Sequence, residues 1–420
     1  MTSRSDNGEG KHSMDLFIRI LVILLSIFSI IRILQDAFES IVLPRKVALR
    51  FRLSRMFYIG LWRIWSWVAV KIVRAGNRRE YFLSYFGPIS LIFLLILWGV
   101  GIIFSFAVLS WALSIPLTAP EKMITFETYL YSSGTMFITL GLGDVVPGSA
   151  LARFLAIAEA GSGSALIALI IGYVPVIYQV FSRRETSIAL LDARAGSPPT
   201  AVEFLRRHAQ EQERPEITLF LRDWERWSTE ILESHLSYPV LNYYRSQHEH
   251  QSWLAALTTI LNVSALLMVG IDELPSTNAR FTFAIARHAA VDLTQSLKTA
   301  TPVPDPSHSR LSHDDFKRMC TMLAEAGLYI RDDQETEQRL CDLRMIYEPF
   351  LRVLADYLLI TLPPWLPEPK SVDDWQTSAW DHFTEWSPAK LAEITDTIIE
   401  KKRPVNYPIK SHNTNHKARL

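Results

Sequence analysis

Two long hydrophobic segments define the N-terminal part of this 420-residue chain. Residues 81–120 contain no charged side chain, and 87–113 alone exceeds the ~20 residues that a helix needs to cross about 30 Å of hydrocarbon. Residues 154–182 are interrupted only by Glu159 and are closed by Arg183, a side chain expected at a cytoplasmic end. Both segments are predicted to span a membrane as helices.

A third hydrophobic segment, residues 16–34, is also predicted to be a transmembrane helix. Its two cations, Arg19 and Arg32, lie near its ends, where a long side chain can reach the membrane interface. A cleaved signal peptide is the alternative, but the apolar stretch is long and no small-residue cleavage site follows it.

Residues 45–79 contain ten Lys and Arg and no acidic residue, so the positive-inside rule predicts a cytoplasmic segment and an external N-terminal tail. At about 100° per residue, six of the cations cover less than half of a helix circumference, opposite the apolar residues; the six are Arg52, Arg55, Arg63, Lys71, Arg74 and Arg78. We expect a helix on the membrane surface, with cations against anionic lipid and three tryptophans in the headgroup layer, Trp62, Trp65 and Trp67. The alternative is a transmembrane helix over 56–70 that contains one charged residue, Arg63. This additional span would place the N-terminus on the other side of the membrane.

Charge is distributed unevenly, although the formal net charge is zero. Residues 1–184 carry 18 Lys and Arg against 10 Asp and Glu, a balance of +8, and residues 185–420 carry 25 against 33, a balance of −8. This layout argues against a nucleic-acid-binding protein and indicates two regions in different surroundings. Cys320 and Cys341 are the only cysteines, so we expect no disulfide framework and no thiolate metal cluster, which fits a reducing compartment.

The segment between the two long spans carries the candidate chemistry. Residues 128–138 are predicted to form a helix too short to cross the bilayer, followed by the run Thr139-Leu140-Gly141-Leu142-Gly143-Asp144. A dehydrated cation needs oxygens in place of its water shell, and backbone carbonyls aimed at one axis supply them. Gly141 and Gly143 permit the positive φ angles that turn successive carbonyls inward, and the C-terminal end of the short helix favours a cation nearby.

This arrangement resembles the pore-loop potassium-channel family over about residues 81–184, and Thr-Leu-Gly-Leu-Gly-Asp is especially similar to filters of its two-pore-domain branch. The resemblance implies K⁺ ions at the backbone carbonyls of Thr139, Leu140, Gly141 and Leu142. Asp144 would lie at the outer mouth. Leu142 replaces the usual Tyr, whose hydroxyl forms a hydrogen bond behind the filter in relatives, and Ile138 replaces a frequent second Thr. One pore sequence per chain cannot surround an axis, so four copies are expected.

The short helix and the span that follows it contain candidate residues for supporting and gating a pore. Thr135 matches the position where some family members carry an acid that braces the filter, and Glu159 is a candidate for that role unless it reaches the extracellular interface near Arg153. Gly163 matches the position where family members bend the inner helix, with close helix packing as the competing explanation. A helix face spaced to line a cavity contains Ser164, Ile167, Ile171 and Pro175.

Residues 185–420 are predicted to form a helical cytoplasmic domain, with helices at 200–212, 215–236, 239–270, 276–297, 312–330 and 335–362. No nucleotide-binding glycine motif, cyclic-nucleotide β-roll or voltage-sensor spacing is indicated. His248-Glu249-His250 beside His235 invites a metal or pH-sensing interpretation, but residues two apart do not share a helix face, which favours surface histidines.

These patterns predict an all-α membrane protein. Its expected parts are an N-terminal transmembrane helix with a basic interfacial helix (1–80), a pore domain of helix, pore helix, filter and helix (81–184), and a cytoplasmic all-helical regulatory domain (185–420). The expected function is a homotetrameric, potassium-selective channel of the plasma or bacterial inner membrane. K⁺ is its permeant ligand, and no organic cofactor, nucleic-acid partner or enzymatic activity is expected; the regulatory ligand is unknown. The alternative is a non-conducting membrane-anchored adaptor or enzyme, against which the intact glycines argue.

The charge rule gives a topology prediction. A cysteine introduced by Ser3→Cys, in a background without Cys320 and Cys341, should react with a membrane-impermeant thiol reagent in intact cells, because ten cations in 45–79 favour the cytoplasmic side. Labelling only after permeabilisation would reverse the N-terminal orientation and favour the additional span over 56–70.

Overall fold

The computed structural model describes residues 6–42, 53–120, 123–209, 214–246, 251–271, 274, 276–297, 299, 301–303 and 310–367. Contacts divide the chain into Met1–Val372 and Asp373–Leu420, and all described residues belong to the first unit. The protein is an all-α membrane protein, as predicted. Within the described residues the strands are limited to one antiparallel pair, β1 (Leu117–Thr118) and β2 (Val146–Pro147).

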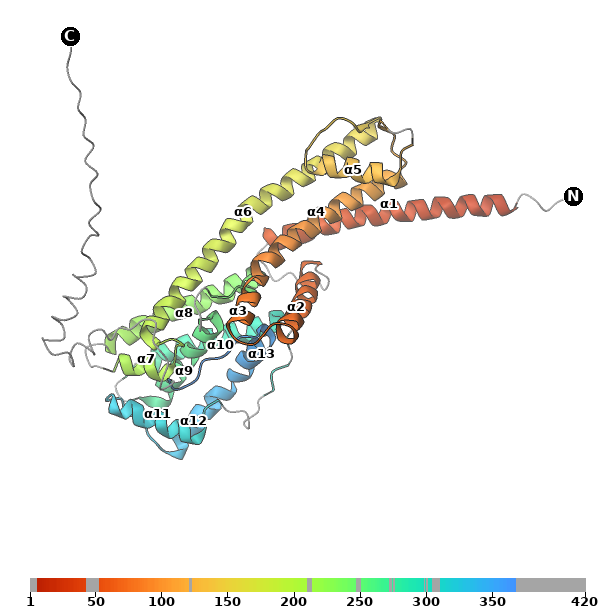
Figure 1. Ribbon diagram of the computed structural model, residues 1–420. Helices are drawn as coiled ribbons and strands as arrows, with labels where there is room; N and C mark the ends of the chain where they lie inside the picture. The colour runs from red at the N-terminus through yellow and green to blue at the C-terminus, as the bar shows by residue number, and fades with distance from the viewer. Residues whose placement is uncertain are drawn as a thin grey trace, which may run out of the picture. The chain divides into compact units, whose positions relative to one another are not determined.

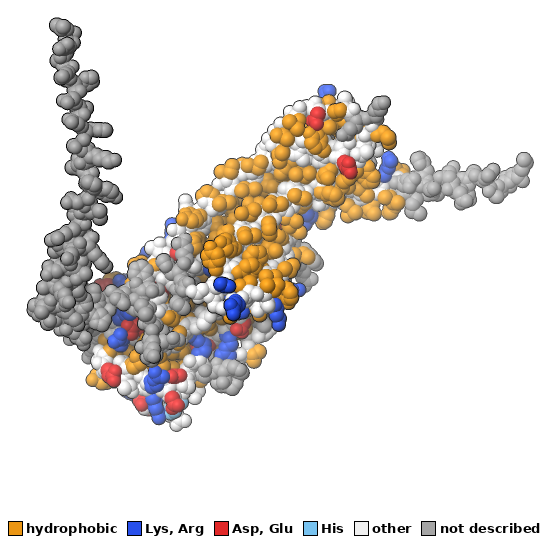
Figure 2. All heavy atoms as spheres, in the orientation of Figure 1, with side chains coloured by type: hydrophobic (Ala, Val, Ile, Leu, Met, Phe, Trp, Pro, Cys, Tyr) orange, Lys and Arg blue, Asp and Glu red, His pale blue; other side chains and the backbone are white. Residues whose placement is uncertain are grey.

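Four of the described helices are long and apolar enough to cross a membrane: Leu16–Ile41, Asn77–Ala112, Ala150–Ala195 and Trp253–Gly270. The first three contain the predicted spans. The fourth has 83% of its apolar window buried inside the protein, so it is a core helix of the C-terminal half rather than a lipid-facing one. Figure 2 shows hydrophobic side chains forming a broad band over the long helices on the face in view.

Helix α1 (Asp6–Ile41) packs against α4 (Phe86–Ala112), and the two run in opposite directions (Figure 1). Ser29 Oγ lies 2.9 Å from Ser105 Oγ. One turn further along α1, the Ile33 side chain packs on Gly101, where an added Cβ would lie only 2.8 Å from Ile33 Cδ1. Small residues on α4 therefore allow the close approach that transmembrane helix pairs use when they associate.

Helix α6 (Ala150–Ala195) is a single helix of 46 residues that contains Pro175. At 1.5 Å per residue it is about 69 Å long, more than twice the hydrocarbon thickness of a bilayer. It continues past residue 184 and ends at Gly196, whose φ of 84° is open to glycine. The boundary predicted at 184 therefore falls inside a continuous helix, which joins the membrane segment to the C-terminal helices (Figure 1).

The basic segment forms α2 (Leu53–Lys71), followed by α3 (Asn77–Ser84). Trp62 is only 3% exposed, its indole N–H donates to the Tyr357 carbonyl at 2.9 Å, and its ring lies 5.0 Å from that of Tyr243. The expectation that this tryptophan faces lipid headgroups is wrong, because protein from the C-terminal half covers it. Trp67 is 58% exposed, so the expectation that it lies in the headgroup layer stays a prediction.

The C-terminal half is helical, as predicted. Its elements are α7 (Ala201–Arg207), α8 (Arg214–Ser237), the 3₁₀ helix η2 (Pro239–Tyr243), α9 (Trp253–Gly270), α10 (Ser276–Leu297), α11 (His313–Glu325), α12 (Gln334–Met345) and α13 (Glu348–Leu358). Thr200 and Ser312 cap α7 and α11 by accepting hydrogen bonds from Glu203 N and Asp315 N. Buried α9 contacts α10, α12 and α7 around it.

Two predicted helices are each two elements. The helix expected over 239–270 is η2 and α9, with Ser252 capping α9. The helix expected over 335–362 breaks at Tyr347, because Pro349 lies in the first turn of α13 and cannot donate the backbone hydrogen bond that a continuous helix needs. His248 and His250 lie outside the described residues, whereas His235 is buried and not at the surface as expected.

Candidate ion-conduction site

Helix α5 (Phe126–Phe137) is the short helix predicted between the spans, and it begins two residues earlier than expected. The backbone N–H of Thr125 donates to Thr128 Oγ1 at 3.3 Å, which closes the first turn. The helix packs between α4 and α6. Its length of twelve residues, about 18 Å, is too short to span a bilayer.

The C-terminal end of α5 is closed by a Schellman motif. Thr139 N–H donates to the Met136 carbonyl at 3.1 Å, and Leu140 N–H donates to the Thr135 carbonyl at 2.9 Å. The motif requires a left-handed residue at Thr139, whose φ is 55°. A β-branched residue in this region is strained by about 1–2 kcal/mol, so the surrounding structure must hold it there.

Left-handed backbone alternates along the candidate filter segment, residues 139–144. Thr139, Gly141 and Gly143 have φ angles of 55°, 61° and 80°, with Leu140 and Leu142 between them. Alternation of this kind turns successive carbonyls toward one side and leaves the side chains on the other. The predicted positive φ angles at the two glycines are present, and the one at Thr139 was not foreseen.

Asp144, at the outer end of the candidate filter segment, is tied back to α5. The Tyr131 hydroxyl donates to Asp144 Oδ2 at 2.8 Å. Leu142 lacks the hydroxyl of the usual Tyr, and Tyr131 of α5, which the sequence did not indicate, provides a hydroxyl at the candidate filter segment. Beyond Asp144, the strand pair β1 and β2 closes the outer loop through Leu117 opposite Pro147.

Glu159 contacts α5 and does not reach the extracellular interface near Arg153. Its buried carboxyl group is hydrogen-bonded to Ser133 Oγ, and the single hydroxyl proton of Ser133 is shared between this carboxyl group and the Ile103 carbonyl of α4, which lies 2.7 Å from Oγ. Thr135, the other candidate support, uses its hydroxyl within α5, donating to the Ser132 carbonyl at 2.8 Å. Ser133 therefore links α4, α5 and α6 by hydrogen bonds, and sequence reasoning missed it.

Gly163 lies directly against the end of α5. A Cβ added to Gly163 would lie 2.0 Å from the Phe137 carbonyl oxygen, whereas a Cβ on neighbouring Gly161 would meet no atom within 4 Å. This contact supports the competing explanation for Gly163, which is close packing of helices through a small residue.

The four residues predicted to line a cavity lie along one side of α6 and are exposed on the single chain: Ser164, Ile167, Ile171 and Pro175. The candidate filter segment is exposed as well, with Leu142 at 62%. Apolar side chains are therefore exposed beside the candidate filter segment on the single chain.

In its C-terminal half, α6 is joined to the C-terminal helices by Arg184. The guanidinium is buried and donates to the carbonyls of Leu241 at 3.0 Å and Tyr244 at 2.9 Å, and it pairs with Glu185 at 2.9 Å. Its Cζ lies 5.1 Å from the centre of the Phe181 ring. Such a cation is well satisfied although it is out of water.

The ring of His235 lies against the same guanidinium, with Nε2 3.3 Å from Arg184 Nη1. Burial, together with the charge of Arg184, holds the pKa of His235 well below its usual range. The imidazole is therefore neutral, and Nδ1, 3.0 Å from the Ile231 carbonyl, carries the proton. This leaves Nε2 free to accept a hydrogen bond from Arg184.

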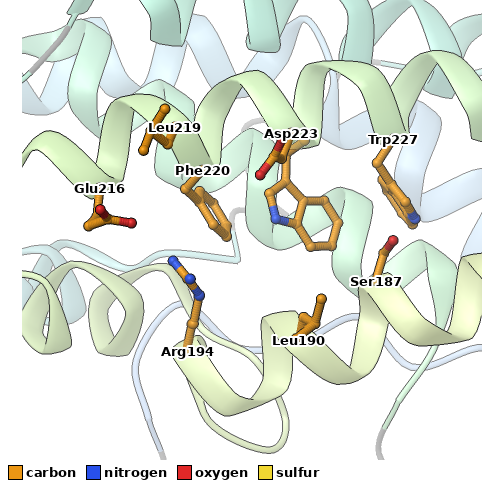
Figure 3. Close-up of a pocket in the computed structure, with 9 residues that line it drawn as sticks. Ser187, Leu190, Arg194, Glu216, Leu219, Phe220, Asp223 and Trp227 are labelled. Carbon is orange, nitrogen blue, oxygen red and sulfur yellow. The ribbon is translucent and has the colours of Figure 1, made fainter.

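A pocket borders the same helix further along (Figure 3). α6 contributes Ser187, Leu190 and Arg194, and the facing helix α8 contributes Glu216, Leu219, Phe220, Asp223, Trp224 and Trp227. Three buried aromatic side chains form the floor, and charges of both signs lie at the rim. Within the described residues no cluster of three or more His, Cys, Asp or Glu could hold a metal ion.

Comparison with known proteins agrees with this geometry. Residues 91–179, which contain α5, the candidate filter segment and most of the membrane part of α6, match the family described as "Ion channel". Over 213 residues the chain is 22% identical to the uncharacterized membrane protein YdjJ of Bacillus subtilis (strain 168), covering 50% of this chain and 60% of that protein. No solved structure matches the chain. Residues 91–179 are thus similar to an ion-channel family, and they lie within a larger membrane protein.

The contact at Gly163 gives a prediction with a matched control. Gly163→Ala should displace the end of α5, because the new methyl group cannot fit 2.0 Å from the Phe137 carbonyl oxygen. The free energy of unfolding of the purified protein should fall by roughly 1–3 kcal/mol. Gly161→Ala, two residues away with nothing within 4 Å, should leave stability within about 0.5 kcal/mol. Thermal unfolding followed by tryptophan fluorescence measures both. Equal melting temperatures for the two variants would contradict the packing role.

Proposed function

We propose that the protein is a homotetrameric, potassium-selective channel whose opening is controlled by its C-terminal helices. The observation that carries the proposal is the alternating left-handed backbone at Thr139, Gly141 and Gly143, positioned at the end of a half-length helix between two spans. Four such segments around an axis would present rings of carbonyl oxygens that replace the hydration shell of K⁺.

The exposed surface supports a tetramer. A single chain contributes one candidate filter segment, and its Leu140 and Leu142 side chains are more than half exposed. Three neighbouring copies would cover these side chains and the exposed face of α6, and the axis would run past Ile167 and Ile171. K⁺ ions would bind at the carbonyls of residues 139–142, with Asp144 at the outer mouth.

The bracing of the candidate filter segment supports selectivity for one ion. Glu159 holds α5 through Ser133, and Tyr131 holds Asp144. One hydrogen bond holds the helix that precedes the segment and the other holds its last residue, and both limit how far the carbonyl rings can open. Rigid spacing discriminates K⁺ from the smaller Na⁺ if cavity size is decisive.

Gating by the C-terminal helices is supported by a continuous set of contacts at residues 238–245, which connect α8 to α9. Tyr243 packs against Phe86 of α4 with ring centres 5.0 Å apart. Tyr244 packs on Gly87, where an added Cβ would lie 2.5 Å from its ring, and its carbonyl binds Arg184 of α6. A shift of this connection therefore acts on the inner ends of both pore-domain helices.

The second candidate function is a membrane-anchored adaptor or enzyme that does not conduct. It keeps the membrane helices and the pocket between α6 and α8, but it gives no reason for left-handed backbone at Gly141 and Gly143 or for the buried Glu159. We infer a channel and no enzymatic activity. Anionic lipid at the basic segment 45–79, a cell-membrane location and a cytoplasmic C-terminus belong to the same proposal.

Ion flux tests the function directly. Liposomes containing the purified protein should pass K⁺ at a rate well above Na⁺, and Gly141→Ala should abolish the flux, because an L residue at φ 61° disfavours the carbonyl-inward backbone. The added Cβ meets nothing within 4 Å, so the fold and assembly should persist. Flux without ion preference would overturn selectivity, and wild-type protein without flux would favour the adaptor or enzyme.

Arg183 and Arg184 form a matched pair for gating. Arg184→Gln should change the open probability in single-channel recordings at least about fivefold, because it removes charge-assisted hydrogen bonds to the 238–245 connection that are worth roughly 1.5–3 kcal/mol each. Arg183→Gln alters an exposed neighbour and should change it less than about twofold. If the open probability is unchanged in both variants, the C-terminal helices do not control opening through Arg184.

A further inference from the structure

An ionisable residue is buried in the N-terminal membrane helix, outside the pore domain. Asp36 of α1 is 4% exposed. Its Oδ2 accepts hydrogen bonds from Trp98 Nε1 at 2.9 Å and from Ser54 N at 3.0 Å, and its Oδ1 accepts one from Ser54 Oγ at 3.1 Å. Burying an ionisable group within a membrane segment costs free energy. Such a group is therefore paired with other polar groups and marks a functional position.

The three hydrogen bonds connect three helices. Trp98 belongs to α4, and Ser54 is the second residue of α2, where backbone N–H groups have no partner inside the helix. The carboxylate therefore satisfies the start of α2 and the indole of α4 at once, and its negative charge suits a helix N-terminus. Loss of Asp36 would leave a buried indole N–H and a buried backbone N–H unsatisfied.

Trp98 lies next to the residue that supports the end of α5. A Cβ on Gly99 would lie 3.6 Å from the Phe137 ring, and Phe137 is the residue whose carbonyl meets Gly163. α4 is thus held from one side by α1, at Asp36, and supports α5 from the other. The position of the Trp98 indole fixes the rotation of α4 at the turn that contacts the base of the candidate filter segment.

We propose that Asp36 is a positioning residue for the filter, acting through Trp98 and Gly99 on Phe137. The inference rests on the proposed channel function and adds to it a role for the N-terminal helices. It also gives the C-terminal helices a second route to the pore, because Trp62 of α2 binds Tyr357 and the first turn of α2 binds Asp36 through Ser54. This route ends at the filter, whereas the route through Arg184 ends at the inner helix.

Substitutions at both ends of one hydrogen bond test the role in full-length protein in planar bilayers. Asp36→Ala and Trp98→Phe should each change the K⁺/Na⁺ permeability ratio or the unitary conductance at least about twofold, the smallest effect expected when one hydrogen bond is lost. Asp36→Asn should stay within twofold of wild type, because its amide oxygen can accept from Trp98 Nε1 and Ser54 N while its NH2 donates to Ser54 Oγ. Permeability and conductance report filter geometry, which changes in expression or tetramer stability alone do not alter.

Ser29→Ala is the matched control, since it removes a hydrogen bond from the same pair of helices, at Ser105, without touching Trp98. It should match wild type. If Asp36→Ala does not assemble, Trp98→Phe decides. This variant keeps an aromatic ring at position 98 and leaves both hydrogen bonds from Ser54 to Asp36 in place. The inference is overturned if Trp98→Phe and any assembled Asp36→Ala have the permeability ratio and conductance of wild type. It is also overturned if Ser29→Ala changes them equally. Neither result affects the proposed channel function. A wild-type protein without current would overturn the proposed function and this inference with it.

Discussion

The contact between the end of α5 and α6 is the constraint on which the membrane part of the protein depends. The Phe137 carbonyl lies so close to Gly163 that no side chain fits between them. A helix end in this position has carbonyl groups without helical partners, and the Schellman bonds to Thr135 and Met136 satisfy two of them. The same motif imposes left-handed backbone on Thr139 and so begins the alternation that the two glycines continue.

Much of this site could be predicted from the sequence, because its signals are local. Span length, the short helix and the glycines at Gly141 and Gly143 are properties of consecutive residues. The pairing of Glu159 with Ser133 is not local, since it depends on the register between two helices that no periodicity determines. Tyr131 gave no signal for a related reason: only the folded chain brings its hydroxyl to Asp144.

In the C-terminal half, helix starts were predictable where a cap was present, as at Thr200 and Ser312, and missed where a proline lay inside an apolar pattern, as at Pro349. Hydrophobicity also does not say what covers a surface. The apolar face of α2 suits lipid as well as protein, and Trp62 is buried by Tyr243. Conversely, Trp253–Gly270 is apolar enough to cross a membrane and is instead surrounded by other helices.

Polar groups, rather than apolar contacts, fix the relative positions of the membrane helices and the helices that follow. Apolar faces tolerate small sliding and repacking, whereas a buried charge must meet its partners in one geometry or remain unsatisfied. Arg184 meets two carbonyls of the connection at residues 238–245, and Asp36 meets the start of α2 and an indole of α4. Each arrangement is stable only in a narrow range of helix positions. A conformational change of the C-terminal helices must therefore move α6 and α2 with it or break these bonds, and breaking either set leaves buried donors without acceptors. Transmission into the membrane is the less costly outcome.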